Sequence, residues 1–279
     1  MQVTVSILVE NTAPMPSVIG EYGFAALVTV NNENYLIDTG NGDAIFKNAS
    51  AMGENLNEVS NLIISHGHFD HTGAVSSLLK MGGIKKIYAH SAVFSKRYIV
   101  TEDDKKDIGS CFSLEEVQTN NAEMIFTDNF TQIAPNIYLT GAVPRNNDYE
   151  DVGSFAGGSF KTEHNGNLVD DTLPDDIALI IDHPDGLIII SGCAHSGIVN
   201  IINYAIEKTG RKKILSFIGG THLMTASDER INKTIEFLKT CNFSQIIPCH
   251  CTGFYSAAKL YSALGNKIIK GEAGMTFRY

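Results

Sequence analysis

The stretch over residues 61–73 constrains this chain more than any other. Its sequence, NLIISHGHFDHTG, joins an apolar run to three histidines and an aspartate. The apolar run predicts a short buried strand, and the turn after it places His66, His68, Asp70 and His71 in one small volume. Nitrogen and carboxylate ligands at this density suit zinc, and also iron, manganese or cobalt. A polar loop is the alternative, but three of the chain's nine histidines lie here.

The spacing of these four side chains favours two metal ions. His66 and His68 alternate, so on an extended segment they face the same way. Asp70 and His71 are adjacent and face differently unless the chain turns. We therefore predict that the first pair binds one ion and that the second pair binds another.

The pattern H-x-H-x-D-H at residues 66–71, after an apolar strand, resembles the signature of the metallo-β-lactamase fold superfamily. The resemblance implies an αββα sandwich of the α/β class, formed by residues 1–279 as a single domain. The chain also opens with a predicted hairpin whose last strand ends in Asp-Thr-Gly at residues 38–40, as in that superfamily. There the equivalent of Asp38 binds no metal but supports the metal loop by hydrogen bonding.

The composition limits the partners and the location of the protein. A length of 279 residues allows a sizeable core, and 43% hydrophobic content is ordinary for a soluble globular protein. The net charge of −10 argues against nucleic acid, which requires a basic face. No apolar run predicts a membrane span, and the N-terminus lacks the features of a secretory signal. Five cysteines without framework spacing are typical of the reducing cytoplasm, where we expect the protein.

Strands and helices alternate in the first part of the pattern, but the pattern weakens over residues 95–174. Strands are predicted at 3–9, 24–30, 35–37, 59–64 and 85–89, with helices at 43–52 and 72–80. We expect residues 95–174 to form an insertion that covers the active site, because so long a structureless loop is unusual in a compact domain. Within it Arg145, Lys161 and His164 are candidates for holding an anionic substrate, although each singly is more typical of a solvated surface charge.

The second half of the chain repeats one arrangement three times. Predicted strands at 187–190, 213–218 and 245–248 each end at a small-residue turn that carries a histidine, namely His195, His222 or His250. A single histidine after a strand is more often structural than a ligand. Three in the same position favour a site, because strand ends at one edge of an α/β sheet are where sites are built. The remaining predicted elements are strands at 124–127, 137–140, 177–181 and 267–269 and helices at 198–209, 231–240 and 254–264.

The superfamily uses two more histidines and a bridging aspartate after its first cluster. His250 in Pro-Cys-His matches the last histidine of that pattern. Cys193 stands where the aspartate is usual, so either a thiolate replaces the bridging carboxylate or the bridge is missing. His195, two residues later, is the further predicted ligand. The common Gly-His-Thr-Pro-Gly motif is absent, which leaves open two full metal sites or one tight and one weak site.

Three ordered motifs resemble one branch of the superfamily. They are SGCAHSG at 191–197, GGTHL at 219–223 and PCHCTG at 248–253. This branch consists of metal-dependent hydrolases similar to the dihydropterin-6-methyl-(ribofuranosyl)aminobenzene phosphate synthases of methanopterin biosynthesis. The resemblance implies the fold and the branch, but it leaves the substrate open.

The resemblance predicts a metal-dependent hydrolase, or a related pterin-processing enzyme, in which a metal-activated water attacks a small anionic substrate. Asp70 would accept a proton from the water or bind the second metal, and His222 would bind or protonate the substrate. Zinc is the expected ion, one or two per chain, with iron or manganese as alternatives. A metal-bound ligand-binding or regulatory protein with little turnover is the rival function, which a missing bridge would allow. A nuclease of the same superfamily is disfavoured by the acidic charge.

Overall fold

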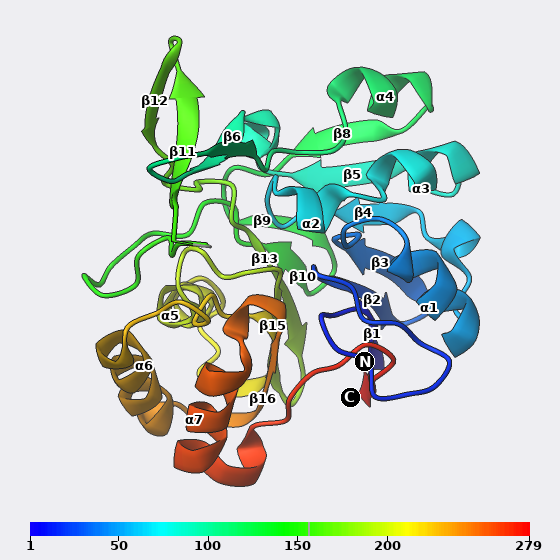
Figure 1. Ribbon diagram of the computed structural model, residues 1–279. Helices are drawn as coiled ribbons and strands as arrows, with labels where there is room; N and C mark the ends of the chain where they lie inside the picture. The colour runs from blue at the N-terminus through cyan, green and yellow to red at the C-terminus, as the bar shows by residue number, and fades with distance from the viewer. Residues whose placement is uncertain (156) are drawn as a thin grey trace.

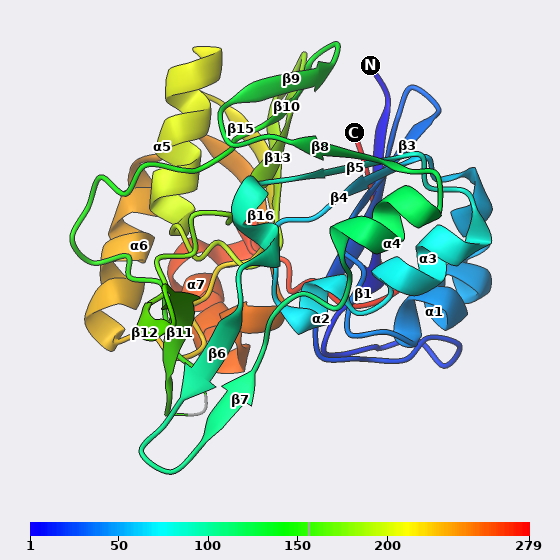
Figure 2. The ribbon, with the colours of Figure 1, turned by 90° about the horizontal axis from the view of Figure 1, so that it is seen from above.

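Two mixed β-sheets pack face to face at the centre of the computed structural model, and helices cover their outer faces (Figures 1 and 2). The structure describes residues 1–155 and 157–279. This αββα order confirms the predicted fold class.

The first sheet holds seven strands in the order β17-β1-β2-β3-β4-β5-β8. Its strands run antiparallel from β17 to β3 and parallel from β3 to β8. The bounds are β1 (Val3–Val9), β2 (Ala25–Val30), β3 (Glu33–Ile37), β4 (Asn61–Ile63), β5 (Lys86–Ala89), β8 (Glu123–Phe126) and β17 (Thr276–Arg278).

The second sheet holds six strands in the order β16-β15-β14-β13-β10-β9. Here β14, β15 and β16 are parallel, and their nearly continuous burial is typical of parallel strands covered on both faces. The bounds are β9 (Thr131–Ala134), β10 (Ile137–Leu139), β13 (Ala178–His183), β14 (Gly186–Ser191), β15 (Ile214–Gly220) and β16 (Phe243–Cys249).

The helices form the two outer layers. On the first sheet lie α1 (Ala44–Met52), α2 (Phe69–Thr72), α3 (Val75–Met81) and α4 (Leu114–Thr119), and on the second lie α5 (Ile198–Thr209), α6 (Asp228–Thr240) and α7 (Phe254–Leu264). Short 3-10 turns complete the chain at η1 (Leu56–Glu58), η2 (Ser91–Phe94), η3 (His250–Thr252) and η4 (Gly265–Lys267). In the part of the chain that the structure describes, no helix combines the length and apolar character needed to cross a membrane.

Buried apolar side chains fill three layers between these elements. Val5 and Val28 of the first sheet face Ile181 and Ile190 of the second in the central layer. The other two layers lie between each sheet and its helices. Since each fully buried side chain of this size contributes about 1.5–3 kcal/mol, this packing holds the two sheets at a fixed separation.

Residues 95–174, expected to form an insertion over the site, are divided among several parts of the fold. The middle of this segment supplies α4 and β8 to the first layer and β9 and β10 to the second sheet. Its two ends form a separate four-stranded sheet, β12-β11-β6-β7, which we call the small sheet. Figure 1 shows its strands β6, β11 and β12 at the top of the molecule. Its bounds are β6 (Arg97–Val100), β7 (Lys105–Asp107), β11 (Ser159–His164) and β12 (Asn167–Asp170).

Two predicted elements differ from the structure. The helix predicted at 72–80 begins only at Val75, as α3, and Thr72 instead ends the short α2, because the backbone N–H of Ala74 donates to Thr39 Oγ1 (3.1 Å). The strand predicted at 267–269 is wrong, since among the residues that the structure describes Ile268 forms a single isolated bridge, to Ile246. The chain instead leaves the second sheet there and adds β17 to the edge of the first, beside β1.

Candidate metal centre

Each predicted site residue lies just beyond the carboxyl end of a strand. Asp38 follows β3, the H-x-H-x-D-H segment follows β4, and the later residues follow β14, β15 and β16. The two sheets bring these ends together, and the ligand atoms form overlapping groups whose members lie within 4.8 Å of one another. The groups contain every predicted metal ligand: His66, His68, Asp70, His71, Cys193, His195 and His250.

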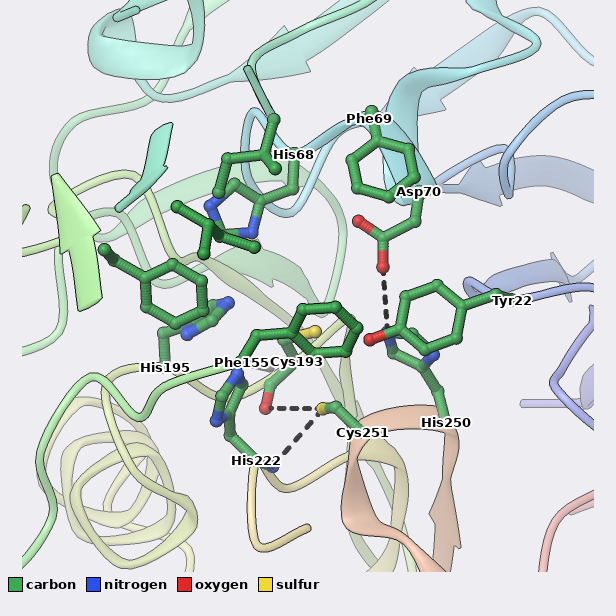
Figure 3. A pocket seen from close by; sticks show the side chains of 13 residues that line it. Tyr22, His68, Phe69, Asp70, Phe155, Cys193, His195, His222, His250 and Cys251 are labelled. Carbon is green, nitrogen blue, oxygen red and sulfur yellow. Dashed lines mark hydrogen bonds and ion pairs between the residues drawn. The ribbon is translucent and has the colours of Figure 1, made fainter. Parts of the chain in front are cut away.

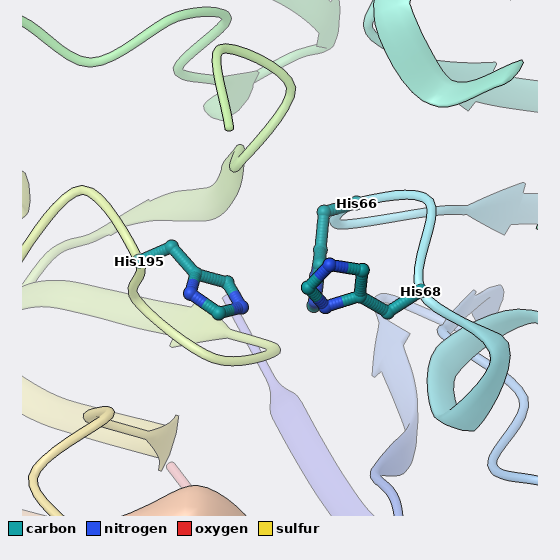
Figure 4. A group of neighbouring side chains, drawn as sticks. All are labelled: His66, His68 and His195. Atoms are coloured by element: carbon teal, nitrogen blue, oxygen red, sulfur yellow. The ribbon is translucent and has the colours of Figure 1, made fainter. Parts of the chain in front are cut away.

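The first group consists of three buried histidines, His66, His68 and His195 (Figure 4). His66 Nε2 lies 3.1 Å from His68 Nδ1. The Nε2 atoms of His68 and His195 are buried and have no hydrogen-bond partner among the described residues. A buried polar atom without a partner is costly and rare, so these two nitrogens mark a place built for a further ligand.

The second group combines nitrogen, oxygen and sulfur. His250 Nε2 lies 3.2 Å from Asp70 Oδ2 (Figure 3). His71 Nε2 lies 3.7 Å from the same oxygen. Cys193 Sγ lies 3.2 Å from His71 Nε2 and also groups with His66, so its sulfur lies between the two groups. This donor set fits zinc or iron.

Asp38 fixes the orientation of residues 65–71, which we call the metal loop, by hydrogen bonds to both of its ends. Its Oδ1 accepts the backbone N–H of Ser65 (2.7 Å), and its Oδ2 accepts both the Ser65 hydroxyl (2.7 Å) and His71 Nδ1 (2.7 Å). Ser65 Oγ lies 2.9 Å from His66 Nδ1. Gly192 lets the end of β14 approach this network, because a Cβ there would collide with the Ser65 hydroxyl.

These contacts decide the tautomers of the histidines. Val152 O and the Asp38 carboxylate can only accept, so His195 and His71 carry their proton on Nδ1. The serine hydroxyl donates to Asp38, so it accepts from His66 Nδ1, and His68 Nδ1 in turn donates to His66 Nε2. In the metal-free protein His68 and His195 therefore keep an Nε2 lone pair without a partner among the described residues, while His66 and His71 are held through Nδ1 by a second partner, as metal-binding histidines are.

A buried ion-pair network, which the sequence did not reveal, supports the same loop. Arg97 of β6 donates to both oxygens of Asp175 (2.7 and 2.9 Å) and through Nε to Asp171 (2.8 Å). Asp175 Oδ2 also accepts the backbone N–H of Gly67 (2.8 Å), between the first two histidines. Gly67 has no room for a side chain, because a Cβ would lie 2.6 Å from Arg97 Nη1. The network thus joins the small sheet to the metal loop.

Burial and the neighbouring charges shift the pKa values of His71 and Asp70 in opposite directions. Burial alone would lower the pKa of His71, but the carboxylates of Asp70 and Asp38 raise it to about 9 in the metal-free protein. Burial alone would raise the pKa of Asp70, but His71 and His250 lower it overall. The protonated imidazole of His71 therefore occupies a place where the field of the protein favours a cation.

We expect metal binding to release the His71 proton. Its raised pKa means that the proton stabilises the metal-free fold below about pH 6.5 and that this contribution is lost as the pH rises through about 9. Below pH 9 the apparent zinc affinity should therefore rise at least about tenfold per pH unit. Competition with a chromophoric chelator at pH 7 and pH 8 measures this ratio, and an affinity that stays constant would contradict it.

A narrow aromatic cavity leads to the centre (Figure 3). Its walls are largely apolar and are formed by Tyr22, Phe69, Ile99, Ile108, Phe155 and Phe160. His222 lies at this cavity with its ring centroid 4.2 Å from that of His195, and its Nδ1 is buried without a partner among the described residues. Burial, with Arg230 nearby, lowers the pKa of His222 to about 3. This ring is neutral at pH 7, so it can share a hydrogen bond but has no extra proton to give.

The three basic candidates for an anionic substrate lie elsewhere. Arg145 donates to two backbone carbonyls, His195 O (2.6 Å) and Thr172 O (2.9 Å), and so braces the loop of a predicted ligand. Lys161 pairs with Asp170 on the small sheet (2.6 Å), and His164 is exposed there. Among the described residues that line the cavity, there is no lysine or arginine.

Sequence reasoning missed several residues that contact the centre. Tyr22, Phe155 and Phe160 come from irregular or weakly patterned segments, which carry no signal of where their rings point. Glu10 accepts the backbone N–H of the last histidine of the site (2.8 Å) from a strand end nearly the whole chain away. Cys251 is the exception, because it stands in the motif PCHCTG and the sequence could have singled it out.

We expect Asp38→Ala to lower zinc affinity by about 10–100-fold, the usual effect of losing a hydrogen-bond partner of a metal ligand. The substitution leaves the His71 and Ser65 contacts unmade while the predicted ligands remain. Zinc titration against a chelator measures the loss. Exposed Asp43 serves as the matched control, and Asp43→Ala should retain wild-type affinity. Equal affinities in the two variants would show that Asp38 does not position the loop.

The comparisons with known proteins agree with this geometry. An uncharacterised protein of Methanocaldococcus jannaschii is 30% identical over 97% of this chain and 98% of its own length. The 7,8-dihydropterin-6-methyl-4-(β-D-ribofuranosyl)-aminobenzene-5′-phosphate synthase of the same organism is 31% identical over 84% of this chain and 82% of its own. The crystal structure of Tm1679, a metal-dependent hydrolase of the β-lactamase superfamily, superposes with a TM-score of 0.82 at 26% identity, covering 99% of this chain and 98% of that one. A family model described as Metallo-beta-lactamase superfamily matches residues 18–204. The chain therefore belongs to the metallo-β-lactamase superfamily.

Proposed function

We propose that this protein is a metal-dependent hydrolase whose centre holds two ions between the sheets. In this proposal His66, His68 and His195 bind one ion, and Asp70, His71 and His250 bind the other. Cys193 lies between the groups and takes the bridging place. The observation that carries the proposal is the convergence of the Nε2 atoms, two of them buried and unpartnered among the described residues. Membership of the superfamily supports the same class of function.

The residues of the chain have separable roles in such a reaction. Metal ions bound at the centre would supply a water of lowered pKa and would polarise the substrate. Asp70 is ionised at neutral pH and directs Oδ2 at His250, and the carboxylate lines the cavity, where it can accept a proton. His222 would position the substrate by a hydrogen bond rather than protonate it. Burial raises the pKa of Tyr22, so its hydroxyl stays protonated and can donate.

The cavity favours a small substrate that carries a flat ring. Tyr22 and Phe155 lie with their ring centroids 5.6 Å apart, and Phe160 lies 5.4 Å from His68. Aromatic walls of this kind bind planar groups by stacking. The relative named as a dihydropterin synthase suggests a pterin-like ring. We propose that any anionic group of the substrate is held by the metal ions, because the cavity-lining residues that the structure describes include no lysine or arginine.

Two further features of the chain are part of the proposal. We propose that the small sheet covers the site, since Ile99 and Phe160 extend from it into the cavity wall. The five cysteines are free thiols, which supports an assignment to the reducing cytoplasm. The acidic net charge and the apolar cavity count against a nuclease.

Metal analysis combined with a hydrolysis screen tests the proposed function. We expect about two metal ions per chain in wild type and about one in Cys193→Ala. The metal-loaded protein should hydrolyse at least one member of a panel containing p-nitrophenyl acetate, a lactone and bis(p-nitrophenyl) phosphate, and chelation should abolish this activity.

The rival function predicts a different result. The thiol of Cys193, in place of a carboxylate, is the observation that favours a ligand-binding or regulatory protein. That function predicts saturable binding of a pterin to the metal-loaded protein without any product. Wild-type protein that binds no metal would overturn both functions.

A further inference from the structure

A second thiol lies beside Cys193 at the place proposed for the second ion. Cys251 directly follows His250 in η3, and its sulfur lies within 4.8 Å of both Cys193 Sγ and the His250 ring nitrogen. Both cysteine side chains are buried, and both line the metal cavity (Figure 3). The two sulfurs come from different strand ends, of β14 and β16, so the fold and not the local sequence places them together.

The surroundings of Cys251 are arranged to hold a sulfur that carries negative charge. The backbone N–H of His222 donates to Cys251 Sγ (3.3 Å), and a hydrogen bond from a backbone N–H stabilises a thiolate. In its protonated form the same sulfur donates to Cys193 O (3.4 Å). Gly220 leaves the necessary space, because a Cβ there would lie 2.6 Å from Cys251 Sγ and 3.0 Å from the Cys193 Cα.

Cys249 provides a comparison within the same motif, because its sulfur does not reach the metal cavity. It is also buried and belongs to the same motif, two residues before Cys251. Its sulfur contacts Ile247 O (3.4 Å), and it lines a separate cavity with Pro248 and Lys270. Burial of a cysteine in this motif therefore does not by itself bring its sulfur to the metal cavity.

We infer that Cys251 is a metal ligand and that, with Cys193, it makes the second position a two-thiolate site. Thiolates prefer zinc, cobalt or iron to manganese or magnesium, so the inference narrows the metal class that the histidines and aspartate leave open. It rests on the metal centre of the proposed function but not on hydrolysis. Its test accordingly reads coordination directly and uses no substrate.

Cobalt(II) substitution under a phosphine reductant tests the inference. Thiolate bound to cobalt(II) gives a near-ultraviolet charge-transfer band whose intensity scales with the number of Co–S bonds. The bridging sulfur of Cys193 would make two of the three Co–S bonds and Cys251 would make one, so Cys251→Ser should lose about a third of the wild-type intensity, Cys193→Ser at least about two thirds, and the double variant all of it. Cys249→Ser, the matched control, should retain the full band. In competition, Cys251→Ser should lose at least about tenfold of the wild-type preference for zinc over manganese.

A second measurement avoids any effect of the substitutions on folding. X-ray absorption of the wild-type zinc protein gives the number of sulfur neighbours averaged over the two ions, and we expect about 1.5 per zinc with both thiolates bound, against about one with Cys193 alone. A single sulfur per zinc, or a full cobalt band in Cys251→Ser, would overturn the inference while leaving the metal centre intact. Wild-type protein that binds no cobalt would overturn both. A two-sulfur site in a protein that hydrolyses nothing would refute the hydrolase proposal alone.

Discussion

Asp70→Asn is expected to lower hydrolytic turnover by about 10²–10⁴-fold, the usual contribution of a positioned acid–base group. The carboxylate is ionised at neutral pH, lines the cavity and contacts the rings of His71 and His250. The amide keeps the size of the side chain but cannot accept a proton and binds metal weakly. Steady-state kinetics on the substrate that wild type hydrolyses best measures the loss, with the pH profile of kcat.

Metal content measured on the same samples separates the two roles of Asp70. A full metal complement with low kcat would assign the residue to proton transfer, and loss of one ion would assign it to binding. Asp185→Asn is the control, because that carboxylate is exposed in the β13–β14 turn. Unchanged turnover in Asp70→Asn, with wild-type metal content, would refute both proposed roles of Asp70, proton transfer and metal binding.

Arg97→Ala is expected to destabilise the fold by about 3–5 kcal/mol, the cost of breaking a buried ion pair by removing one partner. The substitution leaves two buried carboxylates, Asp171 and Asp175, without their cation. Urea unfolding measures the effect. Lys161→Ala is the matched control on the same small sheet, where an exposed Asp170 partner makes the pair worth no more than about 1 kcal/mol. Equal losses of unfolding free energy in the two variants would refute the expectation that the buried Arg97 pairs stabilise the fold more than the exposed Lys161 pair.

The loss in Arg97→Ala should also depend on pH. Burial raises the pKa of Asp175 to about 6 even with Arg97 beside it, against about 4 for an unfolded aspartate. A raised carboxyl pKa means that the folded state keeps its proton to higher pH, so the contribution of this group to stability falls as the pH rises from about 4 through 6. In Arg97→Ala the carboxyl group of Asp175 is protonated at low pH. It is then neutral, so the free-energy cost of burying an unpaired charge is avoided. The difference from wild type should therefore be smaller at pH 5 than at pH 8.

The α/β pattern and the cluster at residues 66–71 could be predicted from sequence because their signals are local. An apolar strand followed by closely spaced histidines needs no partner to be recognised. The same holds for His195, His222 and His250, since each ends an apolar run. Their convergence was an inference from the rule that strand ends meet at one sheet edge, and the structure brings all three to the cavity.

The supporting groups could not be predicted, because they depend on long-range pairing. In the sequence, Arg97 cannot be told from an ordinary surface charge. Its role depends on the fold, which places β6 beside the metal loop. Asp175 follows a proline and reads as a turn. The hairpin of β11 and β12 had a usable signal that was missed, since Asn165-Gly166 at its turn is the pair most typical of a two-residue hairpin loop. The edge strand β17 is too short and too exposed to show a pattern.

The distribution of the site over both sheets has a consequence for the order of folding. The first cluster ends at His71, and His250 follows 179 residues later. Contacts between such distant segments require closure of a long loop, which is slow and comes after local structure has formed. The histidines of the first half therefore remain exposed, without their later partners, until the second sheet packs against the first. Assembly of the centre is then a late kinetic step that reports completion of the whole sandwich.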